Sequence, residues 1–142
     1  MPSNATLTLV LPMPPGVNNQ YVTVGNRRVL SKPARAFRKD VAVLIERLRT
    51  KGQLDPAIEK ALQSSLLGIY CTFYFTSPMR RDLDGGLKIT LDAVCTLLGL
   101  DDRYIVSLTL EKRLDPLHPR VELELGPAEG WQFDQEYVVI EG

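Results

Sequence analysis

The chain has 142 residues, of which 44% are apolar and 24% are charged. This size and balance are typical of one globular domain and exclude a disordered polypeptide. Apolar runs such as 41–45 cover only a few residues, which excludes a transmembrane helix. The N-terminus lacks the basic and long apolar regions of a secretory signal, so we expect a cytoplasmic protein without a membrane partner.

Basic and acidic residues are equal in number, 17 of each, but they are unevenly distributed. Residues 1–50 contain eight Lys or Arg and two Asp or Glu, whereas residues 101–142 contain four basic and ten acidic residues. Such asymmetry favours a basic surface that binds a polyanion, with the acidic end in another role. The alternative is that the two ends neutralise each other in the folded domain.

The chain has two cysteines, Cys71 and Cys95, and a single histidine, His118. The absence of a C-x-x-C pair and of further histidines excludes the usual zinc sites. One disulfide is possible, but both cysteines have apolar neighbours, and we expect two buried thiols.

The N-terminal half is expected to form a strand, a hairpin and a helix. Apolar residues alternate over 6–11, which predicts a half-buried strand ended by prolines. A basic hairpin with a Gly-Asn turn follows at 21–30. Ser31 and Pro33 then mark the start of a helix with apolar residues every three or four positions. These apolar residues are Phe37, Val41, Leu44, Ile45 and Leu48.

The C-terminal half continues with helices and strands. A short helix is expected near 57–62, and strict alternation over 67–75 predicts a strong strand. The spacing of apolar residues predicts a second main helix over 84–99, followed by strands at 105–112 and 121–125. This order indicates a single α+β domain with a mixed or antiparallel sheet and two main helices.

Carboxylates and a lysine cluster around this second main helix. Asp82 and Asp84 form a D-x-D pair at a strand-to-helix junction, Lys88 lies one helical turn after Asp84, and Asp101-Asp102 follow the helix. Carboxylates held together repel each other unless a cation lies between them, and Mg²⁺ prefers oxygen ligands. The alternative is that Asp84 caps the helix and the other acids are solvated loop residues.

These residues belong to a longer series of motifs whose order and spacing match together. The series comprises Leu-Pro-x-Pro-Pro at 11–15, Asn18-Asn19 with Tyr21, Phe37 with Arg38 and Asp40, Arg81-Asp82-Leu83-Asp84, Lys88, Asp92-Ala93 and Asp101-Asp102. Over residues 6–125 the chain resembles the RusA-type Holliday junction resolvases, which are endonucleases of phages and bacteria. The family usually has Asn directly after D-L-D, where this chain has Gly85.

The resemblance implies a RusA-like domain over 1–125, followed by an acidic extension over 126–142. It implies a Mg²⁺-dependent endonuclease of DNA recombination and repair that resolves four-way junction DNA by paired symmetric nicks, as a homodimer. The catalytic set carries over to Asp82, Asp84, Lys88 and Asp102, with the three carboxylates as metal ligands. Asp102 rather than Asp101 is the better match, because it is the second member of the pair.

DNA contacts are expected from the loop and hairpin, the start of the first main helix and the arginines before D-L-D. The residues are Asn18, Asn19, Tyr21, Arg27, Arg28, Lys32, Arg35, Arg38, Arg80 and Arg81. The alternative for these basic residues is an ordinary solvated surface.

Two other functions are compatible with the motifs. A junction-binding protein of the same fold could have lost turnover through Gly85. A Mg²⁺-dependent phosphohydrolase on small nucleotides would also use D-x-D and Lys, but it would not need the basic hairpin and helix.

The extension over 126–142 combines four acidic residues with an apolar set that includes Trp131, Phe133 and Tyr137. A disordered tail would not need these apolar residues, so we expect partial order and carboxylates near basic surface.

Overall fold

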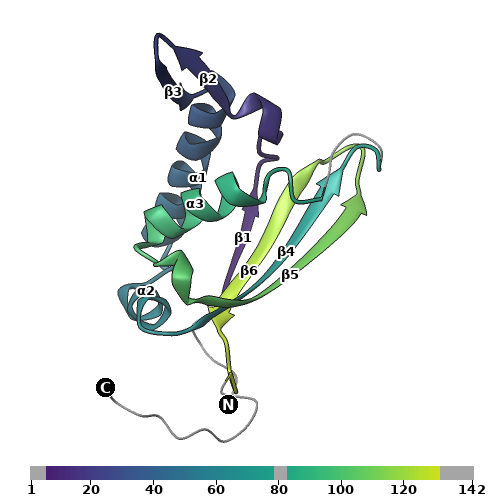
Figure 1. Ribbon diagram of the computed structural model, residues 1–142. Coiled ribbons are helices and arrows are strands. Elements are labelled where there is room, and N and C mark those ends of the chain that lie inside the picture. The colour runs from purple at the N-terminus through teal and green to yellow at the C-terminus, as the bar shows by residue number, and fades with distance from the viewer. Residues whose placement is uncertain (1–5, 79–82, 132–142) are drawn as a thin grey trace, which may run out of the picture.

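The computed structural model describes residues 6–78 and 83–131. Its main sheet has the strand order β1-β6-β4-β5, in which β4 and β5 are parallel and the other neighbours are antiparallel (Figure 1). The strands are β1 (Leu7–Leu11), β4 (Leu67–Phe75), β5 (Ile105–Leu114) and β6 (Arg120–Pro127). The α+β class and the mixed sheet predicted from the sequence are therefore confirmed.

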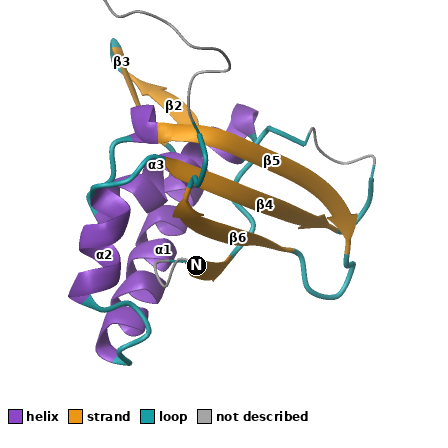
Figure 2. Cartoon of the chain, turned by 90° about the horizontal axis from the view of Figure 1, so that it is seen from below, coloured by secondary structure: helices purple, strands orange, loops and turns teal. Residues whose placement is uncertain are grey.

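Three helices lie together on one side of this sheet (Figure 2). They are α1 (Lys32–Thr50), α2 (Pro56–Gln63) and α3 (Leu87–Leu98). Ser31 caps α1 as predicted, because its hydroxyl accepts a hydrogen bond from the backbone N–H of Ala34. None of the helices in the described ranges is long and apolar enough to span a bilayer.

Alternation along the strands places the core between the sheet and the helices. Every second residue of β1 is buried, and the register aligns Leu9 of β1 with Leu123 of β6. Leu123 in turn aligns with Cys71 of β4, so three strands contribute one apolar row. Cys71 and Cys95 are buried free thiols, as expected, and burial raises their pKa values to about 12 and about 11.

A separate two-stranded sheet extends beyond the N-terminal end of α1 (Figure 1). It consists of β2 (Tyr21–Val24) and β3 (Arg27–Leu30). The turn contains Gly25 at a φ of 62°, a left-handed conformation that favours glycine. A single 3₁₀ turn, η1 (Val17–Asn19), leads into the hairpin.

The start of α3 differs from the prediction. The helix begins at Leu87 with Gly86 as its N-cap and has no side-chain cap, so the predicted capping role of Asp84 is wrong. A turn closed by the Leu87 N–H and the Asp84 carbonyl precedes the helix. Pro14 fixes this start, because a Cβ on residue 86 would lie 2.4 Å from its Cγ. Packing against a distant loop has overridden the local capping signal.

Several expectations fall on residues that the structure does not describe. Arg80, Arg81 and Asp82 lie in the gap at 79–82, and the expected partial order of the extension concerns mainly residues 132–142. Within the described part, β6 continues to Pro127, and Trp131 is exposed.

Candidate active site

The turn before α3 and the first turns of that helix carry one side of the candidate site. Asp84 lies in the turn, and Lys88 and Asp92 follow on successive turns of α3. The Lys88 ammonium lies 3.4 Å from the Asp92 carboxylate, and the Lys88 side chain is largely exposed. Because such an exposed i,i+4 pair contributes only about 0.3–0.5 kcal/mol, Lys88 can leave Asp92 for a ligand at little cost.

The 3₁₀ turn η2 (Asp102–Tyr104) carries the other side and distinguishes between two adjacent carboxylates. Asp101 caps η2 and accepts hydrogen bonds from the Arg103 guanidinium, the shortest at 2.7 Å. This contact lowers the pKa of Asp101. The Asp102 carboxylate makes no hydrogen bond or ion pair within the described residues. Asp101 is thus engaged internally, while Asp102 remains available.

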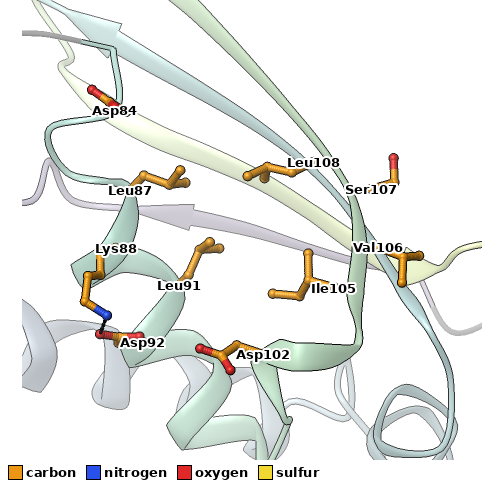
Figure 3. A pocket seen from close by; sticks show the side chains of 10 residues that line it. All are labelled: Asp84, Leu87, Lys88, Leu91, Asp92, Asp102, Ile105, Val106, Ser107 and Leu108. Carbon is orange, nitrogen blue, oxygen red and sulfur yellow. Dashed lines mark ion pairs between the residues drawn. The ribbon is translucent and has the colours of Figure 1, made fainter.

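Asp84, Lys88, Asp92 and Asp102 line a groove of about 540 Å³ between α3 and β5 (Figure 3). Leu87 and Leu91 of α3 face Ile105 and Leu108 of β5 across it. Asp84 lies at one end of the groove, whereas Asp92 and Asp102 lie at the other. The lining residues are Asp84, Leu87, Lys88, Leu91, Asp92, Asp102, Ile105, Val106, Ser107 and Leu108.

The structure therefore brings three of the four predicted catalytic residues to one groove, and the fourth, Asp82, lies outside the described residues. Like Asp102, Asp84 has an exposed carboxylate without a partner among the described residues. In residues 6–78 and 83–131, no three acidic, histidine or cysteine side chains meet as a metal site. The available donors are still carboxylate oxygens, which suit a hard divalent cation such as Mg²⁺ or Mn²⁺.

Two further hollows extend the groove toward basic residues. One, of about 620 Å³, is shared by Asp84 and Lys88 with Tyr21 and Arg28 of the hairpin. The other, of about 630 Å³, places Arg38 of α1 beside Asp102. The carboxylates thus lie between arginines on two sides, an arrangement suited to a polyanion that crosses the site.

The remaining predicted DNA contacts among the described residues line neither of these two hollows. They are Asn18 and Asn19 in η1, Arg27 in the hairpin, and Lys32 and Arg35 in the first turn of α1. All five are exposed. Arg35 donates a hydrogen bond to the carbonyl of Leu30, so it also supports the end of the hairpin.

Sequence analysis did not identify Gln20, which connects the hairpin to the site. Its side chain is only 5% exposed, and Nε2 donates hydrogen bonds to the carbonyls of Gly85 at 2.9 Å and Pro15 at 3.0 Å. Asp92 belongs to the motif series but not to the predicted catalytic set, although it lines the groove and pairs with Lys88. Its one-turn spacing from Lys88 was the available signal.

Comparison with known families explains this combination of groups. The family model for endodeoxyribonuclease RusA matches residues 12–126, which is well over half of the chain. The chain belongs to the RusA endodeoxyribonuclease family. A search of curated proteins finds no match.

The resemblance inferred from the motifs is therefore confirmed, and the protein is an endodeoxyribonuclease. The RusA family hydrolyses phosphodiester bonds of DNA and acts on Holliday junctions, and its nucleases generally depend on a divalent metal. The family also accounts for the junction DNA partner.

Proposed function

We propose that this protein resolves Holliday junctions by Mg²⁺-dependent nicking at the groove between α3 and β5. One observation carries the assignment of residues: Asp84 and Asp102 line the same groove as Lys88, and neither carboxylate has a partner among the described residues. Exposed carboxylates without a partner contribute little to folding and repel a DNA backbone, so their presence on a DNA-binding surface favours a role in catalysis.

Asp82, Asp84 and Asp102 would hold Mg²⁺, with Asp92 close to Asp102 in the groove. When bound, the ion lowers the pKa of water and neutralises charge that develops on the phosphate. Lys88 would exchange Asp92 for a phosphate oxygen, which brings a positive charge to the scissile group. Arg28 and Arg38 would hold the DNA on either side of the site.

The decisive experiment compares two adjacent aspartates on a synthetic four-way junction. Asp102→Asn and Asp84→Asn should each reduce Mg²⁺-dependent cleavage at least about 100-fold, because both remove a proposed metal ligand. Asp101→Asn is the matched control and should retain cleavage, because that carboxylate is engaged by Arg103. Cleavage by Asp84→Asn at the wild-type rate, or greater sensitivity at Asp101 than at Asp102, would contradict the assignment.

Lys88→Ala provides an independent test of the lysine. It should slow cleavage about 100-fold while weakening junction binding much less. Equal losses in binding and cleavage would make Lys88 only a phosphate contact. Hydrolysis of free nucleotides without junction cleavage would instead favour a small-molecule phosphohydrolase.

Paired symmetric nicking further requires two sites, and we propose a homodimer. β5 is an edge of the described sheet, so its outer backbone groups offer a second copy a strand to pair with. Light scattering at micromolar concentration should give about twice 15.9 kDa. A monomer that still nicks opposite strands together would contradict this arrangement.

A further inference from the structure

A hollow beside the carboxylates has the size and chemistry of a nucleotide site. Its volume of about 620 Å³ falls within the range of about 300–1,000 Å³ that is common for small-ligand sites. It opens on the groove, because Asp84 and Lys88 line both. Its complete lining is Val17, Gln20, Tyr21, Arg28, Asp84, Gly85 and Lys88.

Two buried hydrogen-bonding side chains hold the aromatic wall of this hollow in place. Gln20 links the base of the hairpin to the carbonyl of Gly85, next to Asp84. On the other side, Ser31 donates through its hydroxyl to the carbonyl of Asn19 at 2.6 Å and through its N–H to the carbonyl of Gln20 at 2.8 Å. Tyr21 follows Gln20 directly, so its backbone is fixed relative to the turn that carries Asp84.

The side chain of Tyr21 lies against Arg28, whose guanidinium carbon is 4.5 Å from the ring centroid. This cation–π contact orients the ring without burying it, since Tyr21 remains 39% exposed. The Tyr21 ring does not contribute to the hydrophobic core, because all four residues of β2 are exposed. An exposed, oriented ring beside cationic groups is the usual platform for an unpaired base.

We propose that this hollow receives the nucleotide next to the scissile phosphate, with its base stacked on Tyr21 and its phosphate facing Arg28 and Lys88. The proposal rests on the proposed function, since it assumes that Asp84 and Lys88 act on DNA. It makes Tyr21 a specificity-determining residue. A base in continuous duplex is stacked between its neighbours and must be extruded before it can reach the ring, whereas bases at a branch point are more easily unstacked.

The test is a double-mutant cycle between the ring and the base. Cleavage positions are first mapped with the wild-type protein, and junctions are then made with one abasic site within two nucleotides of that position. We expect Tyr21→Ala to slow cleavage of the intact junction about 10-fold, and the abasic site to slow the wild type by a similar factor. Combining both should cause no further loss, because either change removes the same contact.

Matched variants separate stacking from other roles of the residue. Tyr21→Phe keeps the ring and should cleave like the wild type, whereas Tyr21→Leu keeps apolar volume without the ring and should resemble Tyr21→Ala. Val24→Ala removes an exposed side chain of the same hairpin that does not line the hollow, and it should leave cleavage unchanged. Thermal unfolding of each variant checks that the fold is retained.

Binding without metal is measured for the wild type and Tyr21→Ala, each with the intact and the abasic junction. The proposed function and the nucleotide site can therefore fail separately. Coupling in binding without any cleavage would contradict the proposed function and leave the nucleotide site supported. Cleavage that loses independent factors to Tyr21→Ala and to every abasic site would overturn the nucleotide site and leave the endonuclease proposal intact. Unchanged cleavage and binding in Tyr21→Ala would also overturn it.

Discussion

The two sheets of this protein are held together in different ways. In the four-stranded sheet, β1 and β6 bury alternate residues against the helices, whereas all four residues of β2 in the hairpin are exposed. An isolated two-stranded hairpin is only marginally stable in water. The hairpin depends on hydrogen bonds at its base, from Gln20 and Ser31, and on the packing of Leu30 against the core. Folding therefore constrains the side chains of the main sheet, while those of the hairpin remain available for a ligand.

Truncation of a central core residue should give the largest effect on stability. Leu123 lies in β6 between β1 and β4 and is completely buried. Leu123→Ala should lower the free energy of unfolding by about 2–5 kcal/mol, because it leaves a cavity among three strands. Val22→Ala in the hairpin is the matched control and should stay within about 0.5 kcal/mol of the wild type. Urea denaturation measures both, and equal losses would show that the hairpin belongs to the core.

The contact between Pro14 and Gly86 should give an intermediate effect. Gly86→Ala would place a Cβ 2.4 Å from the Pro14 Cγ, and this overpacking should destabilise the protein by about 1–3 kcal/mol. Gly68→Ala is the control, because its Cβ would meet atoms only at ordinary contact distances near 3.9 Å. The same denaturation experiment compares them. A Gly86→Ala protein of wild-type stability would mean that the loop at Pro14 does not fix the start of α3.

The main sheet was predictable because burial imposes a period of two on its sequence. The predicted strand at 67–75 coincides with β4, whereas β5 and β6 extend beyond the predictions to Leu114 and Pro127. Hydrogen bonding between strands can continue where the apolar pattern has ended, so alternation locates a strand better than its ends. The hairpin was predicted from its turn residues rather than from burial, because all four residues of β2 are exposed and only the end of β3 is half-buried.

From spacing alone, the candidate site was predictable only where its residues are close in sequence, and Asp102 was assigned through the family resemblance. Asp84 and Lys88 are only four residues apart, so the turn before α3 and the first turn of that helix are enough to bring them to one site. The contact from Gln20 to Gly85 spans 65 residues, and no local pattern marks that glutamine as buried. The same tertiary contacts explain the wrong prediction for Asp84, since packing at Gly86 moved the start of the helix past the aspartate.

Loss of charge on the hairpin should have the smallest effect on stability and a clear effect on DNA. Arg27 and Arg28 are exposed and form no ion pair in the described residues. Arg27→Ala combined with Arg28→Ala should therefore leave the free energy of unfolding, measured by urea denaturation, within about 0.5 kcal/mol of the wild type.

Each phosphate contact contributes about 0.9 to the slope of log affinity against log salt concentration. The double variant should therefore bind a four-way junction with a slope reduced by about one unit per lost contact. Arg113→Ala, which removes one arginine on the side of the sheet away from the helices, is the control and should keep the wild-type slope. Equal slopes for the hairpin variant and the control would place the DNA on another surface. Reduced stability without a change in slope would show that the arginines support the hairpin rather than the DNA, and the division of roles between the two sheets would be lost.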